Sequence, residues 1–80
     1  MMHIKILGPG CKNCKKLMEN TEQAVKELSI DATLEKVEDY GEIAKLGVLK
    51  TPGLVIDDVV VSEGKVIAAK SIIKLIEAKN

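Results

Sequence analysis

A predicted strand, turn and helix at the start of the chain constrain its fold more than any other feature. Residues 3–7 form a short apolar run rich in isoleucine, which is typical of a buried β-strand. A Gly-Pro-Gly turn follows at 8–10, and residues 14–28 repeat apolar side chains at helical spacing. The chain's two cysteines, Cys11 and Cys14, stand where the strand gives way to the helix. A thiol pair with two intervening residues at such a junction indicates redox or metal chemistry before a structural role.

The rest of the chain alternates strand patterns with helical ones. Apolar and β-branched runs predict strands at residues 32–37, 53–56 and 59–62. Helical spacing predicts a short helix at 40–46 and a final amphipathic helix from Ala69 onward. The predicted order of elements is therefore β-α-β-α-β-β-α.

Local signals indicate how these elements begin, end and pair. Asp39 followed by Glu42 resembles a helix capping box, and Gly47 is a typical helix stop. Asp57 and Asp58 predict a tight hairpin, which would make the last two strands antiparallel. The first two strands should be parallel because a helix connects them, and the charges of the second strand suit a sheet edge. We expect an α/β fold with a four-stranded mixed sheet and helices on both faces.

Size and composition narrow the class of protein. The chain has 80 residues, so we expect a single domain, residues 1–80, and its lone aromatic residue, Tyr40, means that the core is aliphatic. Its 12 lysines balance 12 acidic side chains, and without basic excess or stacking aromatics we expect no nucleic-acid binding. No apolar run approaches the ~20 residues of a membrane span, and the N-terminal run is too short for a signal peptide. We therefore expect a cytoplasmic protein, and a monomer because nothing in the sequence requires an oligomer.

Three roles are open to the cysteine pair. A structural disulfide that closes a loop of about four residues would stabilise the fold by roughly 2 kcal/mol, and such bonds are rare in the cytosol. A closed zinc site needs four ligands, whereas the chain offers two thiols and His3. A two-thiolate site for a soft ion such as Cu(I) stays open, which gives a soft-metal carrier as the alternative function. Thiol–disulfide exchange fits the strand–turn–helix context best, and it requires no metal or other cofactor.

Exchange would give the two cysteines different roles. Cys11 stands at or just before the expected helix N-terminus, where the helix dipole favours a negative charge. Lys12, Lys15 and Lys16 add positive potential, and both effects favour the thiolate, which is the attacking species. Cys14 lies one turn further along on the apolar stripe, where it could resolve a mixed disulfide. We therefore assign Cys11 as the nucleophile and Cys14 as the resolving thiol.

The cysteine motif together with the Thr51-Pro52 step resembles the thioredoxin and glutaredoxin superfamily. The similarity covers almost the whole chain and is greatest to the small redox-active disulfide proteins of archaea and bacteria. It implies a thioredoxin-like fold of glutaredoxin size, with a cis peptide bond before Pro52. It also implies that the backbone of Thr51 pairs with substrate and that Gly64 is the family's glycine near the site. Lys12 and Asn13, between the cysteines, would support the docking surface.

The resemblance also implies a function. A disulfide oxidoreductase of this kind serves electron transport and cell redox homeostasis: it exchanges electrons with disulfide-containing proteins or small thiols, and a reductase supplies the electrons. Two positions depart from the family, since Gly10 stands where thioredoxins carry Trp and Lys5 where they bury an acid. Heavy-metal-associated domains also place such a cysteine motif after a first strand. They end in a strand, however, and have no role for a Thr-Pro step.

Overall fold

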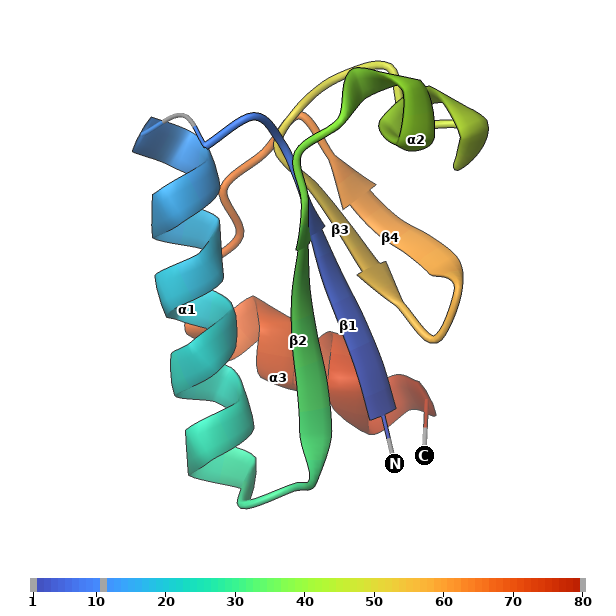
Figure 1. Ribbon diagram of the computed structural model, residues 1–80. Helices are drawn as coiled ribbons and strands as arrows, with labels where there is room; N and C mark the ends of the chain where they lie inside the picture. Colours follow the sequence, from blue (N-terminus) through green and yellow to red (C-terminus); the bar gives the residue numbers. More distant parts are fainter. Residues whose placement is uncertain (1, 11, 80) are drawn as a thin grey trace.

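The computed structural model describes residues 2–10 and 12–79, and its elements follow the predicted order. They are β1 (Met2–Leu7), α1 (Lys12–Leu28), β2 (Ala32–Val37), α2 (Tyr40–Lys45), β3 (Gly53–Ile56), β4 (Val59–Glu63) and α3 (Ala69–Lys79). Figure 1 shows the strands side by side in one sheet, with the helices packed around it. Among the described residues, no helix is long and apolar enough to cross a membrane.

The four strands form one mixed sheet in the order β2-β1-β3-β4. β1 and β2 are parallel, with a register that runs from Met2 opposite Ala32 to Leu7 opposite Val37. β3 is antiparallel to both β1 and β4. The predicted pairing is therefore confirmed, and β2 lies at a sheet edge as its charges indicated. The parallel pair also brings the turn after β1 beside the residues that follow β2.

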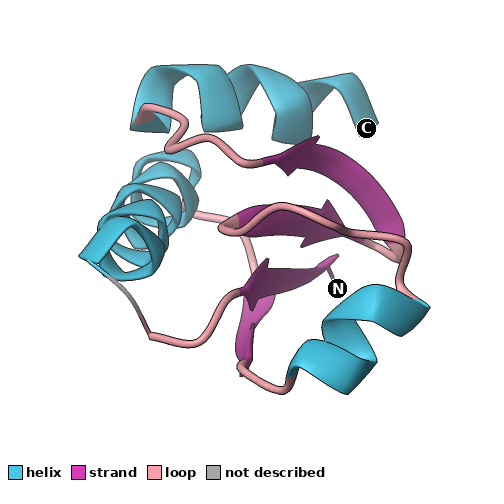
Figure 2. Ribbon diagram, turned by 90° about the horizontal axis from the view of Figure 1, so that it is seen from above, coloured by secondary structure: helices cyan, strands magenta, loops and turns pink. Residues whose placement is uncertain are grey.

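Helices cover both faces of the sheet, and each face has its own aliphatic core. Figure 2 shows α1 and α3 on one face and α2 on the other. The core beneath α1 and α3 contains Met2, Ile4, Ile6, Leu17, Ala24, Leu54, Ile56, Ile72 and Ile76. The core beneath α2 contains Leu7, Val37, Ile43, Val48 and Val55. Both β1 and β3 contribute to both cores, because successive side chains of a strand point to opposite faces.

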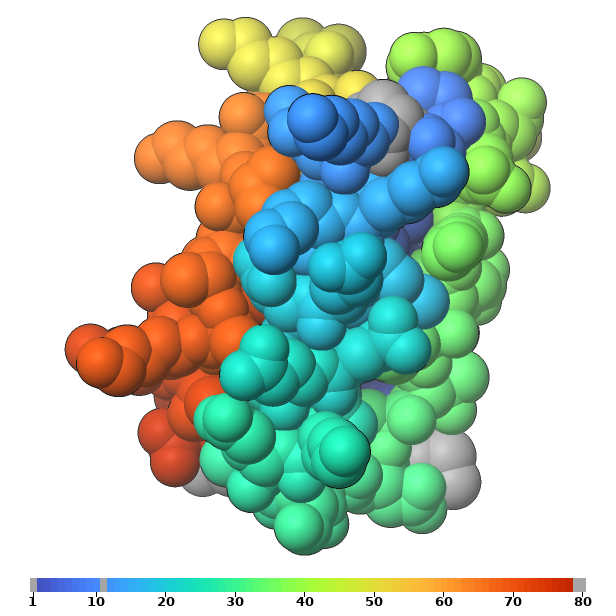
Figure 3. Space-filling model, turned by 90° about the vertical axis from the view of Figure 1, so that its left-hand side faces the viewer, coloured from blue at the N-terminus to red at the C-terminus, as the bar shows by residue number. Residues whose placement is uncertain are grey.

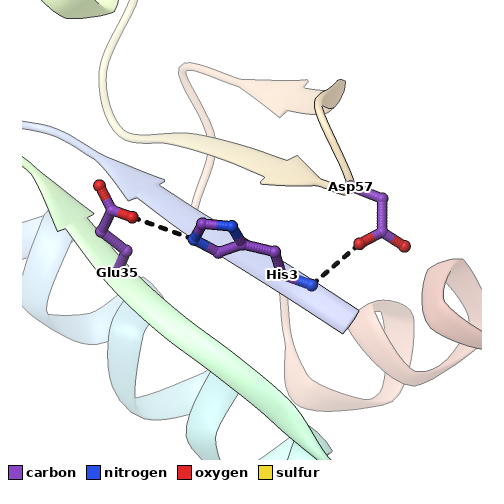
Figure 4. Close-up of polar contacts among 3 residues, drawn as sticks. All are labelled: His3, Glu35 and Asp57. Atoms are coloured by element: carbon purple, nitrogen blue, oxygen red, sulfur yellow. Dashed lines mark hydrogen bonds and ion pairs between the residues drawn. The ribbon is translucent and has the colours of Figure 1, made fainter. Parts of the chain in front are cut away.

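The predicted hairpin between β3 and β4 turns through Asp57 and Asp58. Both have positive φ, 48° and 67°, as in a type I′ turn, whose twist matches that of the paired strands. Asp57 also ties the hairpin to β1, because its Oδ1 accepts a hydrogen bond from the His3 backbone N–H at 2.9 Å (Figure 4). The His3 ring reaches the other way, with Nε2 3.0 Å from Glu35 Oε1 on β2. His3 thus links three strands near one end of the sheet.

Several element boundaries differ from the prediction by one or two residues. β1 begins at Met2, β4 extends to Glu63, and α1 begins at Lys12. Leu46 is the C-cap of α2 and not its last helical residue. The start of α1 was misplaced because its first residues are exposed and polar, so apolar spacing becomes visible only from Cys14 onward.

Asp39 begins α2 as the predicted N-cap. Its backbone is extended, with φ −81° and ψ 120°, and its Oδ2 accepts a hydrogen bond from the Glu42 N–H at 3.1 Å. Asp39→Ala removes that acceptor, so we expect the free energy of unfolding in urea to fall by about 1 kcal/mol. Asp39→Asn keeps an acceptor at the same place and should retain most of the stability. Equal losses in the two variants would show that the capping bond is not the cause.

Candidate active site

Cys14 lies in the first turn of α1, at the end of the sheet where β1 and β2 finish. Its side chain is 5% exposed and is disulfide-bonded. Lys12 and Asn13, which precede it in the helix, are exposed. Cys11, the predicted nucleophile, lies outside the described residues. Cys14 is buried because it belongs to the stripe of α1 that faces the core, on which Leu17, one turn further along, is also buried.

Gly8 lies directly against Cys14. A methyl group at Gly8 would overlap Cys14 Sγ, and it would lie 3.3 Å from Cys14 Cβ and 3.7 Å from Thr51 Cβ. The Gly8 N–H donates to the Val37 carbonyl at 2.9 Å, so β2 holds the backbone at this point. Because Gly8 has no side chain, the start of α1 and the loop before β3 can both pack against the backbone just after β1. From the sequence, Gly8 is expected only as a turn residue, and its place three residues before Cys11 is the one signal for this contact.

The loop before β3 and the turn after β4 meet at Pro52. The Thr51–Pro52 peptide bond is cis, as the resemblance implies. Pro52 is buried and Thr51 is half-buried. The Gly64 N–H donates to the Pro52 carbonyl at 2.8 Å, and a methyl group at Gly64 would come within 3.1 Å of Lys50 Cβ. The structure thus brings Thr51, Pro52 and Gly64 together at the end of the sheet where α1 begins.

One apolar side chain at this end of the molecule is strongly exposed. Leu49, two residues before Thr51, is 87% exposed. Figures 1 and 3 place the loop that carries it at the same end of the molecule as the start of α1. Sequence reasoning missed Leu49, because no local pattern distinguishes it from the neighbouring Val48, which is buried. The fold decides which of these two side chains faces water.

A cavity of about 230 Å³ lies beside Cys14, between α1 and the carboxyl ends of β1 and β2. Its lining residues are Ile6, Gly8, Pro9, Gly10, Cys14, Lys15, Lys36 and Glu38. The Glu38 carboxylate lies against the turn after β1, since a methyl group at Gly10 would come within 3.1 Å of Glu38 Oε2. Figure 3 looks onto the seam between α1 and β2 where this cavity lies. Lys36 was expected only as a charge at the sheet edge, and Glu38 was not expected at the site, because the parallel pairing of β1 and β2 is what brings them to the cysteine motif.

Lysines gather on the first turns of α1. Lys12, Lys15 and Lys16 are exposed, and the first turn of the helix carries no acidic residue. Lys5 lines a separate cavity together with Glu35 and residues of α2. Across residues 2–10 and 12–79, no three His, Cys, Asp or Glu side chains are grouped so that they could hold a metal ion.

Comparison with known proteins agrees with this architecture. Residues 2–77 match the family model described as a thioredoxin domain. The chain is 47% identical over 72 residues to a protein named thioredoxin from Methanocaldococcus jannaschii, and this match covers 90% of this chain and 83% of that protein. It is 41% identical over 76 residues to a protein named thioredoxin from Methanothermobacter thermautotrophicus, covering 95% and 99% of the two chains. A solved structure described as thioredoxin-2, a component of the malaria parasite protein secretion machinery, has the same fold, with a TM-score of 0.75 at 14% identity over 98% of this chain and 82% of that chain. The sequence matches and the shared fold together show that this chain belongs to the thioredoxin domain family.

Proposed function

We propose that this protein is a thiol–disulfide oxidoreductase in which Cys11 is the nucleophile and Cys14 the resolving thiol. The observation that carries the proposal is the state of Cys14, which is buried and disulfide-bonded in the first turn of α1. We propose that its partner is Cys11, the chain's other cysteine. A buried second cysteine suits a resolving role, because it is shielded from external disulfides yet is only three residues from the first in the sequence.

The proposed reaction has two exchange steps. The Cys11 thiolate attacks one sulfur of a substrate disulfide, so a Cys11–substrate bond forms and the other substrate sulfur leaves as a thiolate. Cys14 then loses its proton to solvent and attacks Cys11 Sγ. The Cys11–Cys14 bond forms, the mixed disulfide breaks, and the second substrate sulfur leaves. The substrate gains two electrons, and the protein ends with the Cys14 disulfide.

The residues around Cys14 suit the docking of an extended segment beside the cysteines. Thr51 lies against Gly8, which also contacts Cys14, so a chain that pairs with the backbone of Thr51 would run close to the disulfide. Pro52 and Gly64 hold the two neighbouring turns together through their hydrogen bond. The exposed side chain of Leu49 offers apolar contact next to this line. We assign Lys12 and Asn13, exposed at the helix start, to the rim of the same surface.

The partners that follow from this proposal are disulfide-containing proteins or small thiols as substrates, and a reductase as electron donor. We propose that residues 1–80 act as one domain and as a monomer in the cytosol. The electron donor and the substrate would both exchange through the same two sulfurs, those of Cys11 and Cys14.

A redox titration tests the proposal most directly. We expect the protein, equilibrated in dithiothreitol redox buffers and quenched with an alkylating reagent, to lose or gain two thiols together at roughly −270 to −200 mV, the range of thioredoxins and glutaredoxins. Mass spectrometry counts the alkylated thiols at each potential. Thiols that stay reduced across the series, or that a copurifying metal protects from alkylation, would contradict the proposal and would favour the soft-metal carrier.

A further inference from the structure

We propose that the cavity beside Cys14 binds small disulfides that carry carboxylate groups, and that Lys15, Lys36 and Glu38 select them by charge. The inference rests on the proposed function and names a substrate class for it. The cavity is separate from the surface assigned above to protein segments, since Thr51, Pro52 and Gly64 do not line it.

The position of the cavity suits a substrate pocket. Its walls are α1 on one side and the end of β2 on the other, and the turn after β1 closes it. In sheets with parallel strands, ligands bind in the crevice beyond the carboxyl ends of the strands. Cys14 lines the cavity, and Gly10, which also lines it, is bonded directly to Cys11. A molecule held here would therefore lie next to the cysteine motif.

The size of the cavity limits its occupant. About 230 Å³ lies below the ~300–1,000 Å³ of pockets that enclose drug-sized ligands. A protein segment has its own surface near Pro52, so a compact molecule is the better fit here. Ile6 and Pro9 give the cavity apolar wall, which suits the sulfur and methylene groups of a small disulfide.

The charges in the cavity favour an anion. The residues that line it include two lysines, Lys15 and Lys36, and one carboxylate, Glu38. The Glu38 carboxylate lies against Gly10, at the side of the cavity nearest to Cys11 in the chain. The net charge of the lining is thus positive, and the two lysines approach from different walls, α1 and β2. A disulfide with a carboxylate at its end gains attraction here, whereas an aminated one is repelled.

The chemistry is that of the proposed function, with the small disulfide as oxidant. The Cys11 thiolate forms a bond to one substrate sulfur, and the first substrate thiolate leaves. Cys14 then displaces the second substrate thiolate as the Cys11–Cys14 bond forms. One small disulfide and two protein thiols thus give two small thiols and one protein disulfide, so that electrons and protons balance.

Three small disulfides, one negative, one neutral and one positive, test the inference. Reduced protein is mixed with dithiodiglycolate, which is a dianion, with the neutral 2-hydroxyethyl disulfide, or with cystamine, which is a dication, and the loss of protein thiols is followed. We expect Lys36→Gln to slow oxidation by dithiodiglycolate by up to about fivefold, as for one solvent-accessible ion pair. The same variant should leave the rate with the neutral disulfide nearly unchanged and raise the rate with cystamine. Glu38→Gln should raise the rate with dithiodiglycolate and lower the rate with cystamine.

Lys16→Gln is the matched control, because it also removes one lysine charge near the cysteine motif, at the start of α1, but from a residue that does not line the cavity. It should change the ratio of the dithiodiglycolate rate to the cystamine rate less than Lys36→Gln does, because its charge lies outside the cavity. For each compound, the rate with a variant is divided by the rate with the wild-type protein, so the intrinsic reactivity of the compound cancels. The inference is overturned if Lys36→Gln changes all three rates alike, or if Lys16→Gln alters charge selectivity as strongly. If none of the three disulfides oxidises the wild-type thiols faster than it oxidises free dithiothreitol, while the redox titration still shows a two-thiol transition, the inference fails and the proposed function stands. If the two-thiol transition is absent as well, the proposed function itself fails.

Discussion

Cys11→Ser should lower the rate of disulfide exchange by roughly a thousandfold or more, because a serine hydroxyl supplies no thiolate to attack sulfur. The measurement is the reduction of a protein disulfide by dithiothreitol, with and without the variant as catalyst. Residual turnover close to that of the wild-type protein would contradict the assignment of Cys11 as nucleophile. The same variant also removes the only partner that the chain offers for the disulfide of Cys14.

Cys14→Ser should fail at the second step and not at the first. Cys11 can still attack, so a mixed disulfide with the substrate should accumulate to stoichiometric amount, visible as a mass increase that dithiothreitol reverses. Because Cys14 is buried, a urea unfolding curve of each serine variant serves as the control for folding. A folded Cys14→Ser protein that forms no adduct while Cys11→Ser does would reverse the two roles.

Gly8→Ala should destabilise the protein by about 1–3 kcal/mol, the usual effect of an extra methyl group in a well-packed interior. The added methyl would overlap Cys14 Sγ and also approach Thr51 Cβ, so either α1 or the loop before β3 must move. That loss is a large part of the roughly 5–15 kcal/mol that holds a domain together. We therefore expect a lower urea midpoint and a slower exchange reaction, since the same shift displaces a reacting sulfur.

Gly41→Ala provides the control for this change. Gly41 lies in α2, and a methyl group there would come within 3.1 Å of Asp39 Oδ2, the N-cap acceptor of that helix. Within a helix, alanine is favoured over glycine by up to about 1 kcal/mol, which offsets a weakened cap, so Gly41→Ala should change the stability by less than about 1 kcal/mol. Unchanged stability and unchanged exchange in Gly8→Ala would show that the contact between Gly8 and Cys14 is not a constraint on the site.

Much of the fold could be predicted because its signals are local. Periodicity placed every strand and helix within one or two residues, and the positive φ of Asp57 and Asp58 confirms the hairpin that a two-aspartate turn suggested. Two of the strand pairings followed from the connections, since parallel strands need a crossover such as a helix and a two-residue turn joins antiparallel strands. The pairing of β1 with β3 did not follow from the sequence. Boundaries were less certain where polar residues begin an element, as at the start of α1.

The candidate site was predicted only in part, because most of its contacts join segments that are distant in the sequence. Gly64 was expected near the site, and its hydrogen bond to Pro52 places it against that loop. Gly8, Leu49 and Glu38 were not expected there, because nothing within a few residues of them reports what they contact. Contacts between distant segments depend on strand order and register, which single-residue patterns do not encode.

The sequence by itself determined the reactive residues and the element order of this protein: two cysteines with two residues between them, an aliphatic core, and a strand–turn–helix pattern at whose junction the cysteines stand. Tertiary structure alone decided what surrounds those thiols. The parallel register of β1 and β2 brings Lys36 and Glu38 to the cavity beside Cys14. The antiparallel return of β3 brings Thr51 against Gly8. Reactive groups are properties of residues, whereas a substrate pocket is a property of packing, in which distant segments meet at one point.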